Sequence, residues 1–95
     1  MRFEWDPYKA QVNLAKHGVS FEQASGMFTS GVDFLEIYDD VHSVEEERFI
    51  AIGPISEGIV LVVFTEVVDE TLRIVSARMA TSLERSLYYA HMEAT

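Results

Sequence analysis

The chain of 95 residues contains no cysteine, two prolines and two lysines, and it has no long apolar run. The absence of cysteine excludes disulfide scaffolds, thiol nucleophiles and zinc sites built on cysteine. The longest apolar run, Ile59 to Phe64, is far shorter than the roughly 18 residues that a membrane-spanning helix needs. The N-terminal segment also lacks the apolar core of a signal peptide. We therefore expect a soluble protein that stays in the cytoplasm.

Positive charge is scarce: seven lysines and arginines stand against sixteen acids, for a formal net charge of −9. This balance argues against a surface that binds nucleic acids without specificity. Seven of the acids lie in one stretch that contains no base before Arg48: Asp33, Glu36, Asp39, Asp40, Glu45, Glu46 and Glu47. From Leu72 onward, three arginines outnumber two glutamates. The acidity is therefore local, and we expect the acidic stretch to be solvated or to meet a basic partner.

The overall composition is that of an ordinary globular protein, with 48% hydrophobic and 24% charged residues. A chain of this length suits one hydrophobic core. No repeat, linker or low-complexity tract divides the sequence. We therefore expect residues 1–95 to form a single domain.

Capping residues predict where the helices lie. Asp6 followed by Pro7 is typical of a helix start, and Gly18 allows the positive φ that ends a helix at about residue 16 or 17. Capping boxes at residues 20–23 and 81–84 predict two further helices. The first two helices are joined by so few residues that they should form a hairpin. The residues predicted to face inward are Phe21, Ala24 and Phe28 in the second helix, and Leu83, Leu87 and Ala90 in the last.

Five segments have the pattern of strands: residues 2–5, 34–38, 47–53, 59–64 and 71–77. The segment from Ile59 is apolar on both faces, which suits the centre of a sheet. Pro54 should end the strand before it, and residues 66–70 should form a turn. This order predicts an α+β fold with a short N-terminal strand, a helical hairpin, a four-stranded and mostly antiparallel meander, and a C-terminal helix.

Alternation along the strands assigns side chains to faces of the sheet. Arg48 falls on the same side as Ile50 and Ile52. In the last strand, one side is predicted to carry Leu72, Ile74 and Ser76, and the other Arg73 and Val75.

Common catalytic patterns are missing. The sequence has no nucleotide-binding glycine motif and no serine-hydrolase motif. Its three histidines, His17, His42 and His91, lack metal-ligand spacing, so solvated or helix-capping roles are the simpler interpretation. The acids from Asp39 to Glu47 are consistent with a solvated loop or, less simply, with a divalent cation site.

The arginines are more informative. Arg48, Arg73, Arg78 and Arg85 come from neighbouring elements and can form one patch, and Tyr88 is predicted on the exposed side of the last helix, near Arg85. Guanidinium groups suit phosphate oxygens because their donors form a planar fork. The pattern alone equally allows them to neutralise neighbouring acids.

Several motifs occur in an order that resembles a known family. They are Phe3-Glu-Trp-Asp-Pro with Lys9 and Asn13, Lys16-His-Gly-Val-Ser-Phe-Glu-Gln-Ala24, His42-Ser, Glu46-Glu-Arg-Phe, Ile52-Gly53, Arg73-Ile-Val-Ser-Ala-Arg78, Ala80-Thr81, Glu84-Arg85 and Leu87-Tyr88. Together they cover nearly the whole chain and resemble the BrnT family, the toxin halves of type II toxin–antitoxin pairs.

The resemblance implies a RelE-like α+β fold and a ribonuclease that needs no metal or cofactor and blocks translation by cleaving RNA. It also implies a BrnA-type antitoxin with a DNA-binding domain as partner. The toxin would reach operator DNA only through this antitoxin, and the complex is expected to be a heterotetramer.

The resemblance also suggests roles for individual residues. RNA cleavage by its own 2′-hydroxyl needs a base, an acid and a clamp for the charge that develops on the phosphate. The suggested assignments are Arg48 and Arg78 as the clamp, Arg85 as a positioning contact, His17 or Glu84 as the proton-transfer group, and Lys16, Arg73 and Tyr88 as substrate contacts.

The sequence departs from the family at four usually basic positions, which here are Met79, Ser82, Leu83 and Ser86. Fewer phosphate contacts should weaken RNA binding. Two further hypotheses therefore stand beside an active ribonuclease toxin. One is a weakened or inactive protein that binds the antitoxin or acts as a co-repressor, and the other is the acid-lined cation site.

Overall fold

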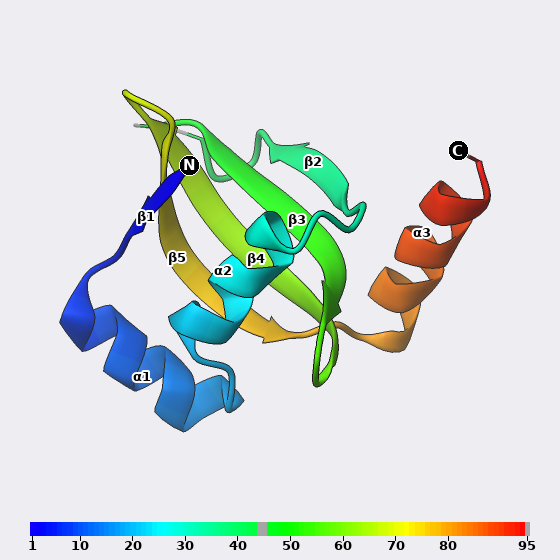
Figure 1. Cartoon of the computed structure of the whole chain (residues 1–95), viewed down its shortest axis with the longest axis horizontal. Coiled ribbons are helices and arrows are strands. Elements are labelled where there is room, and N and C mark those ends of the chain that lie inside the picture. Colours follow the sequence, from blue (N-terminus) through cyan, green and yellow to red (C-terminus); the bar gives the residue numbers. More distant parts are fainter. Residues whose placement is uncertain (44–45, 95) are drawn as a thin grey trace.

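The computed structural model describes residues 1–43 and 46–94 and has a mixed α+β architecture (Figure 1). Its elements are β1 (Arg2–Glu4), α1 (Pro7–His17), α2 (Phe21–Thr29), β2 (Leu35–Asp39), β3 (Arg48–Ile55), β4 (Gly58–Val67), β5 (Thr71–Met79) and α3 (Ser82–Glu93). The strands form one sheet in the order β1-β5-β4-β3-β2. β1 runs parallel to β5, and all other neighbours are antiparallel. The predicted fold class is confirmed, with β4 in the centre.

Helices α1 and α2 lie together on one side of the sheet, whereas α3 lies apart (Figure 1). Their boundaries follow the predicted caps: the Asp6 side chain accepts from the first amides of α1, and Gly18 ends it with φ 73°. Ser20 and Gln23 form the expected capping box of α2. The main core lies between α2 and the sheet, and it buries Phe21, Ala24 and Met27 against β3, β4 and β5. No helix among the described residues is both long and apolar enough to span a membrane.

Three strands run past their predicted ends, and β5 does so by two residues, to Met79. Strand β3 does not stop at Pro54, because Pro54 still pairs with Ile59 and the hairpin closes at Ile55 and Gly58. Strand β4 continues to Val67, which pairs with Thr71. In each case cross-strand pairing extends a strand past a residue that local propensity alone would treat as its end.

The predicted face assignment of β5 was also wrong beyond Ile74. The pairing of β5 with β4 shifts between Val63, opposite Ser76, and Phe64, opposite Ile74, so that Val75 is an extra residue in the strand. Such a bulge reverses the alternation of side chains. Ala77 therefore enters the core instead of Ser76. Arg73 and Arg78 consequently pair with Thr65 and Leu61, which lie four residues apart on one face of β4.

Helix α3 does not face the sheet with the predicted residues. Leu83 is 71% exposed and Leu87 45%, whereas Tyr88 is only 6% exposed. Ala90 is exposed as well. Tyr88, predicted on the exposed side, instead packs with Ile52, Leu61 and Ala80 in a second, smaller core. Its hydroxyl donates a hydrogen bond to the carbonyl of Asp33, 3.3 Å away, so Tyr88 attaches α3 to the sheet.

Candidate functional site

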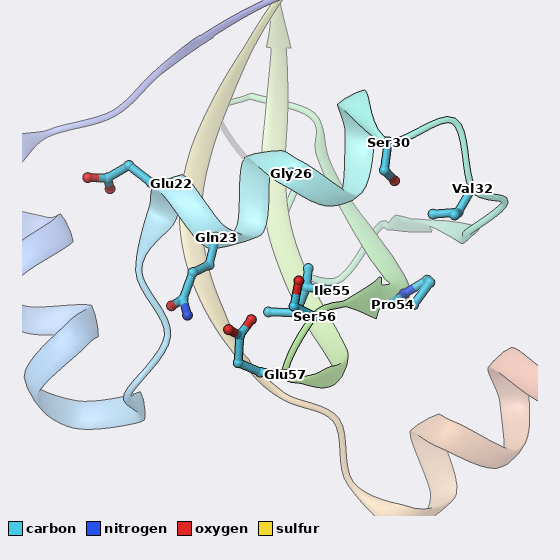
Figure 2. Close-up of a pocket in the computed structure, with 9 residues that line it drawn as sticks. All are labelled: Glu22, Gln23, Gly26, Ser30, Val32, Pro54, Ile55, Ser56 and Glu57. Atoms are coloured by element: carbon cyan, nitrogen blue, oxygen red, sulfur yellow. The ribbon is translucent and has the colours of Figure 1, made fainter.

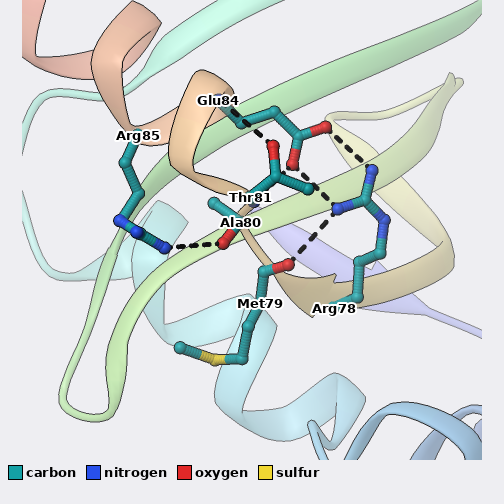
Figure 3. Close-up of polar contacts among 6 residues, drawn as sticks. All are labelled: Arg78, Met79, Ala80, Thr81, Glu84 and Arg85. Atoms are coloured by element: carbon teal, nitrogen blue, oxygen red, sulfur yellow. Dashed lines mark hydrogen bonds and ion pairs between the residues drawn. The ribbon is translucent and has the colours of Figure 1, made fainter.

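The start of α3 brings three of the predicted site residues together (Figure 3). Arg78, at the end of β5, donates from both terminal nitrogens to Glu84, with each N···O distance 2.8 Å. A third hydrogen bond runs from Arg78 Nη1 to the Met79 carbonyl at 3.3 Å. A two-pronged contact of this kind fixes the plane of the guanidinium. Arg78 is thus held in one orientation beside the helix N-terminus.

The same turn fixes Arg85. Thr81 caps α3 by accepting from the Glu84 amide, and Glu84 accepts in return from the Thr81 amide at 2.8 Å. Arg85 donates to the Ala80 carbonyl at 3.0 Å and to the Ser82 hydroxyl at 3.1 Å. Two guanidinium groups therefore flank one capping box, next to the positive end of the helix dipole. This end of α3 suits an anion such as phosphate.

Glu84 is ionised throughout the physiological range. The hydrogen bonds from Arg78 lower its pKa from 4.5 to about 2, against an opposing effect of burial and with a further contribution from the Thr81 amide. A carboxyl group with such a pKa holds no proton near pH 7 and cannot donate one. With both carboxylate oxygens bonded by Arg78, Glu84 is placed to position Arg78.

We expect Glu84→Gln to remove an acid-sensitive part of the stability. The pKa is lowered on folding, so the contribution of the ion pair is complete above about pH 4.5 and is lost as the pH falls toward 2. The pair is partly exposed, and we expect about 1 kcal/mol at pH 7. Urea unfolding at pH 7 and pH 2.5 measures the difference between the intact chain and the variant, which at the lower pH should fall to about a quarter of its pH 7 value, because a pKa of about 2 leaves Glu84 partly ionised there.

Glutamine keeps an acceptor for the Thr81 amide, so this variant tests the charge rather than the cap. Glu93→Gln, at the exposed end of α3, is the matched control and should give no such pH-dependent difference. An equal difference between Glu84→Gln and the intact chain at both pH values would contradict the assignment.

A second set of predicted residues lies along the free edge of β5. β1 pairs with β5 only as far as Arg73, so the strand edge beyond it is open. Buried Asn13 of α1 occupies this edge: its amide donates to the carbonyls of Ala77 and Val19, and its oxygen accepts from the Ala77 amide. Asn13 thereby replaces a strand neighbour and fixes α1 beside β5.

A groove of about 240 Å³ runs between α1 and β5. It is lined by Tyr8, Lys9, Val12, Asn13, Lys16, His17, Val75 and Ser76. Both lysines of the chain lie here, and within residues 1–43 and 46–94 no carboxylate forms an ion pair with either. Tyr8 is 72% exposed, which leaves its ring free to stack. This groove is the part of the chain where unpaired positive charge is concentrated.

Lys9 also lines a second hollow, together with Arg73, Glu4, Trp5 and Asp6. Arg73 is paired with Glu4 at 2.7 Å. In the other direction along β5, Ser76 lines the groove and Arg78 follows two residues later. Three features therefore follow one another along β5. They are Arg73, the groove that contains both lysines, which we call the lysine groove, and Arg78 with Glu84 and Arg85, which we call the Arg78 cluster.

Arg48 is not part of this arrangement. It lies at the start of β3, opposite Asp39 of β2 and on the same face as Ile50 and Ile52, as predicted. Ile52 of β3 pairs with Leu61 of β4, which pairs with Arg78 of β5. Arg48 lies four residues before Ile52, which corresponds to about 13 Å along the strand. The four arginines therefore do not form one patch: Arg78 and Arg85 lie together, while Arg48 and Arg73 lie toward the opposite end of the sheet.

The acidic stretch offers no cation site in the part that the structure describes. No group of three histidine, aspartate or glutamate side chains there is placed to hold a metal. Asp39 instead accepts from His42 Nδ1 at 3.0 Å. Glu45 lies outside the described residues.

Three residues that line the groove between α1 and β5 are not among the predicted site residues. Lys9 and Asn13 are predicted only as parts of the family motifs, and Tyr8 is not predicted. The periodic spacing of Tyr8, Val12 and Lys16 along one helix face was the available signal for a groove.

The chain is similar to known proteins in sequence and in fold. Residues 5–84 match the model of a family described as the ribonuclease toxin, BrnT, of type II toxin–antitoxin systems. The crystal structure of the ribonuclease toxin BrnT from Brucella abortus, solved at 1.1 Å, matches with a TM-score of 0.68 and 31% sequence identity, over 86% of this chain and 99% of that one. No curated protein sequence matches. The chain belongs to the BrnT family of ribonuclease toxins of type II toxin–antitoxin systems.

Proposed function

We propose that this protein is a metal-independent endoribonuclease that acts in the cytoplasm and inhibits translation by cleaving RNA. The observation that supports it most is the concentration of unpaired positive charge beside β5 in a chain of net charge −9. Both lysines lie in this groove, and Arg78 and Arg85 follow at its end. Phosphates of a single strand can follow such a track while a base stacks on exposed Tyr8.

In the proposed mechanism, the 2′-hydroxyl oxygen attacks the adjacent phosphorus and the 5′-oxygen leaves. The products are a 2′,3′-cyclic phosphate and a 5′-hydroxyl. Arg78, with its guanidinium plane fixed by Glu84, stabilises the charge that develops on the non-bridging oxygens. Arg85 and the amides at the start of α3 hold the neighbouring phosphate in position.

Proton transfer is assigned to His17. It lines the groove beside Ser76, two residues before Arg78 on the same strand. An imidazole can take the proton of the 2′-hydroxyl and return one to the leaving oxygen. Lys16 and, further along β5, Arg73 contact phosphates on one side of the cleaved bond, and Arg48 acts as a more distant contact on the same strand of RNA.

The partner in this proposal is a BrnA-type antitoxin whose DNA-binding domain carries the complex to operator DNA. The complex is a heterotetramer of two toxins and two antitoxins. Membership in a type II toxin–antitoxin family supports the antitoxin as such.

Two observations favour a second candidate, an inactive partner of the antitoxin. Met79 and Leu83 stand at positions that are usually basic in the family, and they are 42% and 71% exposed. The Arg73 and Arg78 side chains are also already paired with carboxylates of the chain. A protein of this kind would bind the antitoxin without cleaving RNA.

Cleavage of single-stranded RNA in EDTA distinguishes the two candidates. We expect the purified chain to produce fragments with 2′,3′-cyclic phosphate ends. The double variant Lys9→Ala, Lys16→Ala should raise KM about tenfold and reduce the slope of log affinity against log salt by about 1.4, because two phosphate contacts are lost.

Arg2→Ala is the matched control, because it removes a positive charge outside the groove, and it should leave the salt slope nearly unchanged. Absence of cleavage by the intact chain at low salt would reject the ribonuclease and favour the second candidate. If Arg2→Ala changes KM and the salt slope as much as the double lysine variant does, the groove is not the RNA path.

A further inference from the structure

A hollow that is separate from the proposed RNA path lies between α2 and the hairpin of β3 and β4 (Figure 2). Its volume is about 490 Å³. Gly26 lines it from the helix, and Val32, Pro54 and Ile55 provide an apolar wall. Glu57 lies at one end near Gln23, and Val32 and Pro54 lie at the other. We refer to this hollow as the α2 groove.

Gly26 has no role inside the protein that requires glycine. The other four glycines each have one: Gly18, Gly31 and Gly58 have positive φ, and a Cβ on Gly53 would lie 2.7 Å from both Met27 Sδ and Phe34 Cβ. Gly26 has ordinary helical geometry, and a Cβ there would meet nothing within 4 Å. Glycine inside a helix is unfavourable compared with alanine. The missing side chain therefore keeps the groove open and exposes the backbone of α2 to whatever occupies it.

The charge of the α2 groove selects the kind of occupant. Its two charged lining residues, Glu22 and Glu57, are both acidic, and no lysine, arginine or histidine lines it. Within the described part of the chain, neither glutamate forms an ion pair. An occupant that carries positive charge beside an apolar side chain would satisfy both the wall and the rim.

We propose that the α2 groove is the docking site for a segment of the antitoxin. The segment places an apolar side chain against Val32 and Ile55, passes its backbone close to Gly26, and presents lysine or arginine to Glu22 and Glu57. The proposal rests on the antitoxin partner of the proposed function but not on RNA cleavage. It also leaves the Arg78 cluster and the lysine groove outside the docking site, so that binding and catalysis can be measured separately.

The test compares stability and binding in the same variants. Gly26→Ala should raise the Tm of the free chain by about 4 °C, because alanine favours the helix. It should at the same time weaken binding to the co-encoded antitoxin, measured by calorimetry, about tenfold. Gly26→Leu should weaken binding about 100-fold without lowering the Tm, and Glu57→Lys about tenfold. A gain in stability combined with a loss of binding is the specific expected result.

Gln11→Leu on exposed α1 and Glu93→Lys on α3 are the matched controls, and both should bind as the intact chain does. Unchanged affinity of Gly26→Leu, an equal loss in Gln11→Leu, or failure of the intact chain to bind the antitoxin would each overturn the proposal. A dimer of the free chain that Gly26→Leu abolishes, measured by light scattering, would also overturn it and assign the groove to a second copy. RNA cleavage by free Gly26→Leu should equal that of the intact chain, so loss of ribonuclease activity is distinguished from loss of docking.

Discussion

Replacing Arg78 with alanine is expected to lower kcat/KM for RNA cleavage about 10³-fold. In the proposed mechanism Arg78 supplies the donors that meet the developing charge on the phosphate, and removal of a single preorganised donor in such a site costs about 10² to 10³ in rate. Glu84 and the Met79 carbonyl take three of the five donors of Arg78 and fix its plane, and Nε–H and the second Nη2–H remain for the phosphate, so the loss should lie at the upper end of this range. Single-turnover cleavage of a defined RNA measures the change, and we expect expression of the intact chain, but not of the variant, to arrest growth.

The controls separate charge from shape and from folding. Arg78→Lys retains the positive charge but not the planar fork, and it should recover only a small part of the rate. Glu84→Gln leaves Arg78 free to move and should lower kcat about tenfold with little change in KM, as expected of a positioning residue. The Tm of Arg78→Ala should fall by only a few degrees, because the ion pair is partly exposed. Cleavage by Arg78→Ala within threefold of the intact rate would remove Arg78 from the mechanism.

The helix boundaries and the order of the strands could be predicted because local chemistry determines them. Asp6, Ser20 and Thr81 cap the helices from side chains that are a few residues from their partners, and Gly18 ends α1 through its own backbone geometry. The double-sided apolar pattern of β4 placed it in the centre of the sheet. Each of these features depends on residues that are close together in the sequence.

The arrangement of the site could not be predicted because it depends on pairing between distant segments. The bulge at Val75 is visible only in the register of β5 against β4, and it places Arg73 and Arg78 on one face although they are five residues apart. The inward face of α3 is determined by the Ile52 and Leu61 surface, which takes Tyr88 rather than the leucines. The separation of Arg48 from Arg78 likewise follows from the strand order and register. Patterns along one strand carry no information of this kind.

The role of Asn13 also depends on contacts between distant segments, and its replacement should have a large effect on stability. A single asparagine in a helix is usually a solvated residue or a mild helix breaker. Here it is 6% exposed and makes three hydrogen bonds, two of them to Ala77, 64 positions away in the sequence. It is the polar connection between α1 and the open edge of β5, and the lysine groove lies over it.

Asn13→Ala is expected to destabilise the chain by about 3 kcal/mol, which is a drop in Tm of roughly 15 °C for a domain of this size. The alanine would leave the carbonyls of Val19 and Ala77 and the amide of Ala77 without partners in a buried position, and each such group contributes about 1 kcal/mol or more to the loss. Urea unfolding measures it directly. Gln11→Ala, on the exposed side of the same helix, should change stability by less than about 0.5 kcal/mol.

Asn13→Asp tests the two hydrogen bonds that Asn13 donates separately from the one that it accepts. Its carboxylate can still accept from the Ala77 amide, but it cannot donate, and at pH 7 it places a negative charge against two carbonyl oxygens. It should therefore be at least as unstable as Asn13→Ala at pH 7 and should regain part of the loss when acid protonates the carboxyl group. RNA affinity should fall in both variants in proportion to the population in which α1 has separated from β5, because Lys9 and Lys16 depend on this attachment for their position. A stable Asn13→Ala variant with intact RNA binding would show that α1 is held by its apolar contacts alone and that the groove does not need the asparagine.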